Sequence, residues 1–236
     1  MTDLTALEKT LGISFNNAQI LEQALVHSSF VNENPAQAPK SNERPEFLGD
    51  AVLGLIIAEE LYRSVPDASE GELTNLRAAL VRGDTLARLA RAIGIGGHLQ
   101  LGRGEEANGG RDKTTNLAGA LEAVIAAVFL DQGFAATREC TLRLFQTELH
   151  RAINQGVEIN YKSRLQKFIQ ERGGETPVYY VTRTEGPAHN HSFTVEVRSG
   201  NAILSNGTGK SKKLAETEAA RYALDKLLGQ PPPQST

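Results

Sequence analysis

The chain has 236 residues, enough for two modest domains or one large one, and 40% of them are hydrophobic and 22% charged. This composition is ordinary for a folded protein and argues against wholesale disorder, and no apolar run approaches the roughly 18 residues that cross a bilayer. The start, Met1-Thr2-Asp3, does not read as a signal peptide, and the single cysteine, Cys140, makes no internal disulfide. These features predict a cytoplasmic protein in a reducing setting, with no membrane as a partner.

The net charge of −3 conceals an uneven distribution along the chain. Residues 1–150 hold 13 Lys and Arg against 20 Asp and Glu, a net of −7, whereas residues 151–236 hold 12 against 8, a net of +4. An acidic half joined to a basic half suggests carboxylates for metal and lysines for phosphate. Charge alone equally allows two solvated surfaces of opposite sign.

Residues 4–150 are predicted to form an almost entirely helical domain, with a core that ends at about residue 133. Apolar residues recur there at helical spacing, from Leu7 to Val26, from Phe47 to Ile56 and from Leu86 to Ile93. Two polar segments rich in Pro, Asn or Gly are expected to be loops, Asn32–Ser41 and Gly102–Lys113.

The pattern changes near Gln155-Gly156, so we expect a linker at 151–159 and a second domain at 160–229. The residue pattern predicts a helix, three strands and a helix. The first helix is expected at about Tyr161–Arg172, the strands at Pro177–Thr184, which is rich in Val, Tyr and Thr, at Phe193–Val197, where apolar and polar residues alternate, and at Ala202–Ser205, and the last helix at about Ser211–Leu228. The tail at 230–236 holds three consecutive prolines and is expected to be disordered. The predicted fold is an all-α domain followed by an α+β domain of α-β-β-β-α order.

The most informative stretch of the sequence is acidic. Glu43, Glu46 and Asp50 follow one another at intervals of three and four, so a helix presents them on one face. Like charges placed in this way destabilise an isolated helix, and a divalent cation compensates for them. Mg²⁺ in particular prefers oxygen ligands. Spacing alone leaves a solvated acidic face as the alternative.

Two further carboxylates stand out by their surroundings. Glu122 lies in the apolar run Leu117–Leu130, where a lone charge is costly to bury unless it is paired or bound to metal. Glu70 begins a helix, where a capping carboxylate or one favoured by the helix dipole explains it at least as well as a functional role. The five scattered His and the one Cys show no zinc-protease or Cys-His arrangement.

A basic segment is expected to start the last helix, running from Gly207 through Gly209 and Lys210 to Lys213. Its glycines allow close approach of the backbone to a ligand, and its three lysines converge on one turn, which together favour a site for a phosphate backbone. The nucleotide-binding P-loop pattern fails, because Leu204 stands where that pattern requires glycine. A solvated lysine cluster is the alternative interpretation.

These residues carry a resemblance to a known family. The run Asn42–Leu53 resembles the signature of bacterial ribonuclease III, as do Leu25–Ser29, Leu76–Gly83 and Leu101–Arg111, and the likeness covers essentially residues 5 to 228. It implies a homodimer of helical nuclease domains, each followed by a double-stranded-RNA-binding domain. It also implies hydrolysis of both RNA strands with Mg²⁺, or Mn²⁺ as a substitute, leaving 5′-phosphates and short 3′ overhangs. Processing of ribosomal, messenger and transfer RNA precursors is a further implication.

The resemblance also assigns residues to roles. It implies that Glu46 and Glu122 are metal ligands, that Asp50 and Glu122 are catalytic, and that Glu43 and Glu70 are accessory acidic residues. In the second domain it implies that RNA is contacted by Gln166 and His189 at minor grooves and by Lys210, Lys212 and Lys213 at phosphates.

One position departs from the family pattern, because Gly119 stands where an aspartate that binds metal is usual, three residues before Glu122. This departure puts in question how tightly metal is held. It keeps open a second hypothesis, a double-stranded-RNA-binding protein with a weakened or inactive nuclease site. A dimeric structural scaffold is a third, with no sequence feature of its own.

Overall fold

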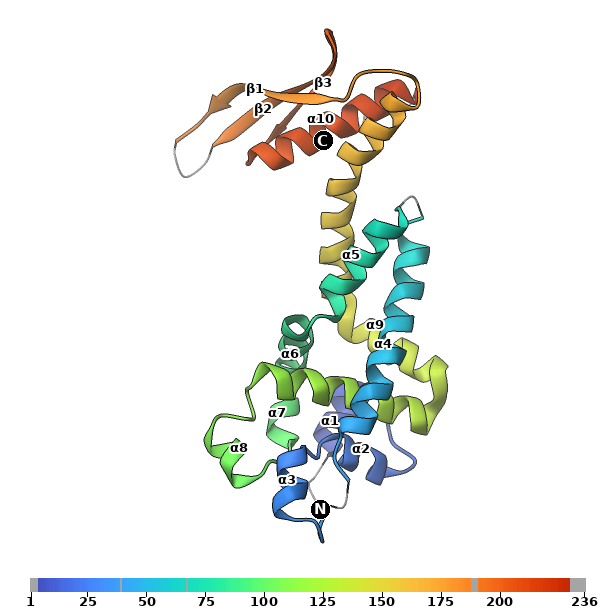
Figure 1. Cartoon of the computed structure of the whole chain (residues 1–236), viewed down its shortest axis with the longest axis vertical. Helices are drawn as coiled ribbons and strands as arrows, with labels where there is room; N and C mark the ends of the chain where they lie inside the picture. Colours follow the sequence, from blue (N-terminus) through green and yellow to red (C-terminus); the bar gives the residue numbers. More distant parts are fainter. Residues whose placement is uncertain (1–3, 39, 67, 188–190, 230–236) are drawn as a thin grey trace. The chain divides into compact units, whose positions relative to one another are not determined.

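A computed structural model describes residues 4–38, 40–66, 68–187 and 191–229, with the backbone alone described at 155–160. The chain divides into two compact units, one up to Ile153 and one from Asn154 onward (Figure 1). The expected fold class is confirmed, since a helical unit is followed by an α-β-β-β-α unit. The backbone at 151–159 is helical, and the expected limits of the domains and the linker stay predictions. The expected disordered tail at 230–236 lies outside the described residues.

The first unit consists of helices with short connections (Figure 1). They are α1 (Thr5–Leu11), α2 (Ala18–Ala24), α3 (Ser28–Glu33), α4 (Glu43–Ser64), α5 (Glu70–Val81), α6 (Gly83–Ala92), α7 (Ile95–His98), α8 (Arg103–Ala107) and the first part of α9 (Thr114–Gln170). The short helix α8 lies within the segment 102–113 that was expected to be a loop.

The first part of α9 supplies much of the core of this unit. Its residues from Leu117 to Val128 are buried, except Glu122, and they pack with buried leucines and isoleucines of α1, α2 and α4. The stretch Thr114–Asn154 is long and apolar enough to cross a membrane by length and composition, but 61% of its apolar 18-residue window is buried within the structure. Its apolar surface therefore already serves as core. The helix is interrupted at Gly133, where φ is 78° and ψ is −179°.

Backbone bonds between distant segments fix the start of α4 beside the start of α3. Val26 pairs with Gln100 in an isolated parallel bridge, and the backbone N–H of Asn42 donates to the Val26 carbonyl at 2.7 Å. The buried Asn42 side chain donates to the carbonyl of Ala24 at 3.3 Å. These bonds satisfy buried polar groups, and they hold three separate connections together at one end of α4.

The second unit is a three-stranded antiparallel sheet packed on helices. The strands are β1 (Val178–Glu185), β2 (Ser192–Ser199) and β3 (Ala202–Gly209), in the order β1-β2-β3, followed by α10 (Lys212–Leu227). Val195 and Val197 alternate inward to a core that includes Leu165 of α9 and the alanines of α10. Sequence alternation therefore predicted the buried face of β2 correctly.

Strand β3 extends to Gly209, whereas the sequence predicted its end at Ser205 and assigned Gly207–Gly209 to the start of the helix. The reason is close packing of β3 against α10. A Cβ atom at Gly207 would lie 2.2 Å from the backbone nitrogen of Ala219, and one at Gly209 would lie 2.6 Å from that of Ala215. These glycines thus serve contact between strand and helix, rather than approach to a ligand.

Candidate functional site

The acidic residues of α4 meet Glu122 of α9 where the two helices cross. Gly49 makes this crossing possible, because the backbone of Glu122 fills the space that a side chain at position 49 would need. Glu46 and Glu122 are half-buried, while Asp50 is exposed to solvent. The carboxylates of α4, which the sequence marked by their spacing, and Glu122, which it marked by its apolar setting, thus lie near the same helix crossing.

Electrostatics identify this place as a site of concentrated negative charge. Burial first, and then the negative charges of Asp50 and Glu46, together raise the pKa of Glu122 from 4.5 to about 7. Burial and the neighbouring Glu43 also raise the pKa of Glu46, while His27 opposes that shift. Carboxylates that repel one another in a half-buried setting give up their protons reluctantly, or share a cation.

Beside these carboxylates lies a cavity of about 200 Å³. It is lined by His27, Ser28, Asn42, Glu43, Glu46, Thr115, Asn116 and Gly119. The carboxyl carbon and Oε2 of Glu46 lie 2.7 Å from where a Cβ of Gly119 would be. The Glu46 carboxylate therefore occupies part of the space that an aspartate at position 119 would use.

The donor set fits a hard divalent cation, because it consists of carboxylate oxygens that repel one another. As the side chains stand, no three His, Cys, Asp or Glu residues in the described part of the chain are arranged to hold a metal ion. The carboxylates of Glu46 and Glu122 would have to turn toward a cation to ligate it. Mg²⁺ commonly retains several waters and needs only one or two carboxylates, so such a site is compatible with its chemistry.

Glu43 and Glu46 line this cavity, and Asp50 and Glu122 lie close enough to interact electrostatically, whereas Glu70 belongs to another part of the unit. It is exposed at the first position of α5 and lines a different cavity, of about 560 Å³, with Tyr62 and Arg77 among others. Its carboxylate accepts a bond from Thr74 Oγ1 at 3.1 Å. The capping box at this helix start is formed by Ser69 and Glu72 instead.

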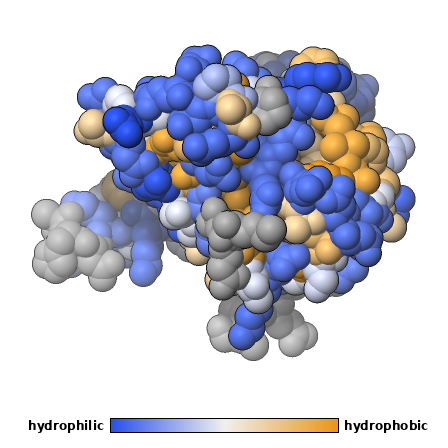
Figure 2. All heavy atoms as spheres, turned by 90° about the horizontal axis from the view of Figure 1, so that it is seen from below, coloured by the Kyte–Doolittle hydropathy of each residue, from blue (hydrophilic) through white to orange (hydrophobic). Residues whose placement is uncertain are grey.

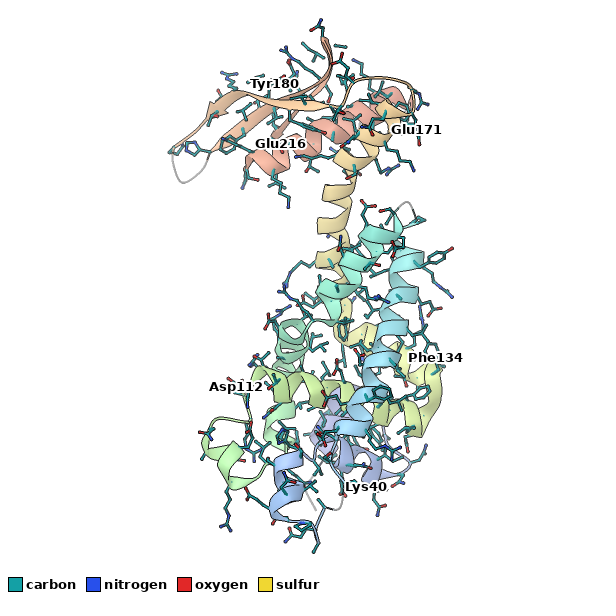
Figure 3. All side chains as sticks on the ribbon, in the orientation of Figure 1. Lys40, Asp112, Phe134, Glu171, Tyr180 and Glu216 are labelled. Atoms are coloured by element: carbon teal, nitrogen blue, oxygen red, sulfur yellow. The ribbon has the colours of Figure 1, made fainter. Side chains whose placement is uncertain are left out.

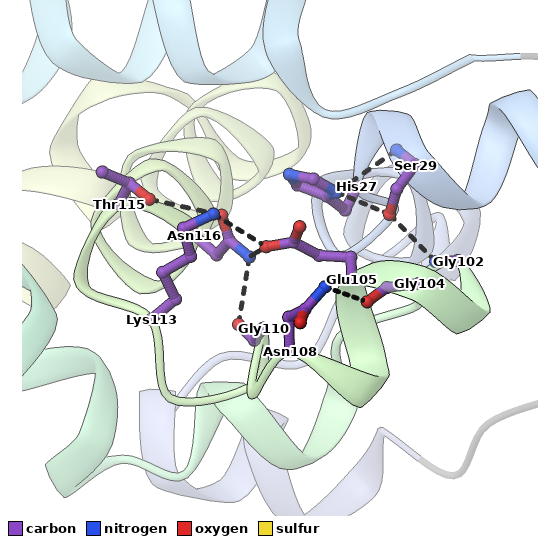
Figure 4. Close-up of polar contacts among 10 residues, drawn as sticks. All are labelled: His27, Ser29, Gly102, Gly104, Glu105, Asn108, Gly110, Lys113, Thr115 and Asn116. Atoms are coloured by element: carbon purple, nitrogen blue, oxygen red, sulfur yellow. Dashed lines mark hydrogen bonds and ion pairs between the residues drawn. The ribbon is translucent and has the colours of Figure 1, made fainter.

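His27 and Asn116 are among the residues of the acidic cavity that were given no role from the sequence. The Asn116 side chain donates to Glu105 at 2.7 Å and to the Gly110 carbonyl at 3.0 Å, which fixes the loop before α9 to its first turn (Figure 4). His27 belongs to the Leu-Val-His-Ser-Ser run that contributed to the family resemblance, which was the only signal for it. Nothing in the sequence marks Asn116.

The basic residues of the second unit lie at the start of α10. Lys212 and Lys213 occupy its first turn, Lys210 precedes it, and all three side chains are exposed. Ser211 caps the helix by accepting from the Leu214 N–H at 3.2 Å. Among the described residues, none of the three lysines forms an ion pair, so their charges are available to a ligand.

The first helical segment of this unit carries Gln166, which is exposed. One turn earlier, Lys162 pairs with Glu216 of α10 and lies 4.8 Å from the centre of the Tyr179 ring. Glu216 is labelled on α10 in Figure 3. These contacts tie the segment that carries Gln166 to the helix that carries the lysines. His189 lies outside the described residues.

Comparison with protein families matches both units of the chain. Residues 17–149 match the family described as Ribonuclease-III-like, and residues 161–227 match the double-stranded RNA binding motif. The first match covers more than half of the chain and includes every acidic residue of the cavity.

Individual relatives are similar in sequence to this chain along nearly its full length. Ribonuclease 3 of Dehalococcoides mccartyi (strain ATCC BAA-2266) is 53% identical over 96% of both chains, and Ribonuclease 3 of Roseiflexus sp. is 47% identical over 94% of this chain and 95% of the relative. The nuclease domain of ribonuclease III from Campylobacter jejuni is similar in structure, with a TM-score of 0.58 and 38% identity over 63% of this chain and 97% of that one.

Proposed function

This chain belongs to the ribonuclease III family and is an endoribonuclease with a double-stranded-RNA-binding domain, and we propose that it hydrolyses both strands of duplex RNA with Mg²⁺, leaving 5′-phosphates and short 3′ overhangs. The observation that carries this proposal is the half-buried Glu122 carboxylate, whose pKa is raised to about 7 by burial, Asp50 and Glu46. A divalent cation relieves that repulsion, and Mn²⁺ is the proposed substitute.

The proposed roles follow from position. Glu46 and Glu122 would hold the cation, with Asp50 as the third carboxylate coupled to Glu122. When bound, the metal lowers the pKa of an attacking water and stabilises the negative charge that builds on the phosphate. Glu43 lines the same cavity and keeps it acidic. Glu70 is proposed as an accessory residue, although it faces another cavity of the same chain.

The second unit is proposed to hold the duplex. Lys210, Lys212 and Lys213 would contact phosphates, while Gln166 and His189 would face minor grooves, since such domains recognise A-form shape rather than sequence. Precursors of ribosomal, messenger and transfer RNA are the proposed substrates. We place the enzyme in the cytoplasm, where the single thiol of Cys140 stays reduced.

We propose that the enzyme is a homodimer formed through large apolar side chains that are exposed near the start of α4 and in α9. The side chain of Phe47 is 82% exposed and that of Leu130 is 56% exposed, which is unusual for large apolar residues. Both line a cavity of about 890 Å³ that also includes Glu43 of the acidic site. Figure 2 shows hydrophobic residues, coloured orange, in patches on the molecular surface. A related nuclease domain from Campylobacter jejuni is described as having a flexible region involved in dimer formation.

The test is a cleavage assay on a long RNA duplex with Mg²⁺, followed by gel separation and mapping of product ends. Asp50→Ala and Glu122→Ala should still dimerise and bind duplex RNA but cut it orders of magnitude more slowly, because they remove metal ligands or their support rather than RNA contacts. Cleavage by either variant near the wild-type rate would contradict the proposed site. For the dimer, Phe47→Glu should shift the sedimentation coefficient to that of a monomer.

A second candidate function is duplex RNA binding with little or no cleavage. Gly119 favours it, because the site lacks one carboxylate that the family usually supplies. The same cleavage assay decides between the two functions, since a binding protein would retain the duplex intact at every Mg²⁺ concentration.

A further inference from the structure

His27 has a ring that is held by hydrogen bonds at Nδ1 and, among the described residues, a second ring nitrogen without a hydrogen-bond partner. The half-buried ring lines the acidic cavity with Glu46 and Gly119. Its backbone N–H donates to the Gln100 carbonyl at 3.0 Å, in the segment that pairs with Val26. Backbone hydrogen bonds therefore hold the residue at the edge of the site.

Hydrogen bonds on the other side of the ring determine where its proton lies. The Nδ1 atom accepts from the backbone N–H of Ser29 at 3.2 Å, and it lies 2.8 Å from Ser29 Oγ (Figure 4). Ser29 Oγ in turn accepts from the Gly102 N–H at 2.9 Å, which leaves the hydroxyl proton to be donated to Nδ1. An Nδ1 atom that accepts twice carries no proton, so the ring proton is on Nε2.

The Nε2–H group has no hydrogen-bond partner among the described residues. Its surroundings are acidic, because His27 acts electrostatically on both Glu46 and Glu105. Glu105 is engaged by Asn116 at 2.7 Å and by Lys113 at 3.2 Å. The ring is held through Nδ1, and Nε2–H has no partner among the described residues, at the wall of the cavity. Such a donor is suited to bind an oxygen atom of the substrate.

We propose that His27 contacts the substrate, donating from Nε2 to a non-bridging oxygen of the phosphate that is cleaved. This inference rests on the proposed function. A donor placed in advance stabilises the charge that develops on phosphate oxygens, and it needs no reorganisation at the moment of reaction.

The chain offers a matched pair of variants that separates this role from a structural one. The side chain of His27 also caps α3 through its bond to the Ser29 N–H. His27→Asn keeps an acceptor at the capping position but has no donor that reaches the place of Nε2. His27→Gln supplies an amide N–H near the place of Nε2 but is a poor cap. A capping role predicts that Gln is the more harmful variant for every property, whereas substrate contact predicts opposite orders for stability and cleavage.

The experiment measures single-turnover cleavage of an RNA duplex with Mg²⁺, duplex binding with Ca²⁺, and thermal unfolding. We expect His27→Asn to unfold near the wild-type temperature and to bind the duplex equally well, but to cleave about 100-fold more slowly, the loss typical of one removed transition-state donor. His27→Gln should unfold at a lower temperature yet cleave faster than His27→Asn.

Cleavage by the wild-type protein tests the proposed function, and comparison of the two variants tests the role of His27. If the wild-type protein leaves the duplex intact, the proposed function is wrong. If the wild-type protein cleaves and His27→Asn cleaves at the same rate, or if the two variants rank alike in stability and in cleavage, His27 is a helix cap and the inference is overturned.

Discussion

The backbone carbonyl oxygen of Glu122 lies 1.8 Å from where a Cβ atom of Gly49 would be. No side chain fits at that position while α4 and α9 keep their distance, and the obstacle is backbone rather than a flexible side chain. The glycine within the acidic signature therefore sets the approach of the two helices that carry the carboxylates. Its absence of a side chain is a structural requirement of the site.

Gly49→Ala should accordingly destabilise the protein by about 3 kcal/mol or more, because overpacking against backbone forces the helices apart. Cleavage should fall as well, since Glu46 and Asp50 would move away from Glu122. The free energy of unfolding from urea titration measures the first effect. Gly71→Ala is the matched control, because nothing lies within 4 Å of its added Cβ, and it should be neutral or stabilise by about 0.5 kcal/mol. Equal stability of the two variants would contradict the close crossing.

The raised pKa of Glu122 makes the stability of the metal-free protein depend on pH. The folded state holds this proton up to about pH 7, whereas the unfolded chain releases it near the ordinary value of 4.5. The unfolded state thus binds fewer protons between these values, so the free energy of unfolding decreases as pH rises through that window. Burial of Glu46, with Glu43 beside it, adds an effect of the same sign.

Glu122→Gln should therefore stabilise the metal-free protein at pH 8 and change little at pH 4.5. We expect about 1 kcal/mol at pH 8, because the side chain is only half-buried and solvent screens the repulsion. Urea unfolding in the presence of a chelator measures this difference. Saturating Mg²⁺ should reverse the order, since it stabilises only the protein that binds it. If the difference in stability between the Glu122→Gln variant and the wild-type protein is the same at both pH values, ionisation of Glu122 does not destabilise the folded state.

The sequence predicted those parts of the site that depend on spacing along one helix. Glu43, Glu46 and Asp50 fall on one face of α4 because intervals of three and four do so in any α-helix. His27 and Asn116 reach the cavity through bonds between distant segments, such as Val26 with Gln100 and Asn116 with Glu105. No local pattern encodes such pairings, so these two residues were not predicted.

In the second unit, too, the sequence predicted features that depend on local spacing and missed one that depends on packing between a strand and a helix. Alternation predicted β2, because its inward valines pack on α10. The end of β3 was wrong by four residues, since Gly207 and Gly209 resemble turn residues in sequence. Their glycine identity reflects packing against Ala215 and Ala219, which lie in a helix that begins only after the strand.

The exposed lysines at the start of α10 should determine affinity for duplex RNA without affecting sequence preference. Replacing Lys212 and Lys213 together with Ala should weaken binding similarly for all duplexes and flatten the dependence of affinity on salt by about one unit of slope per lost phosphate contact. Filter binding at several salt concentrations measures both quantities. Lys226→Ala, in the last turn of the same helix, controls for net charge. An unchanged salt slope in the double variant would assign these lysines to solvent.

The resemblance to the family places Gly119 where an aspartate is usual, and its neighbour Glu46 determines what a substitution at this position does. Helix stability does not explain the glycine, which costs roughly 0.8–1 kcal/mol relative to alanine inside a helix. An added Cβ would meet the Glu46 carboxylate at 2.7 Å, and that carboxylate is the far end of a flexible side chain and can move. Substitution is therefore tolerable, but it displaces a proposed metal ligand.

Two variants separate the effect of space from the effect of charge. Gly119→Ala moves the Glu46 carboxylate without adding charge, so it should leave the Mg²⁺ requirement of cleavage unchanged or raise it. Gly119→Asp adds a carboxylate one helical turn before Glu122, and the additional negative charge should lower the Mg²⁺ concentration for half-maximal cleavage by about tenfold.

Initial cleavage rate against Mg²⁺ concentration measures this, with duplex binding checked separately in Ca²⁺. Coincident titrations for the wild-type and aspartate proteins would mean that the missing carboxylate does not limit metal binding. Cleavage by the aspartate variant alone would make the native protein a double-stranded-RNA-binding protein, because Glu46 and Glu122 would then be insufficient to hold the metal.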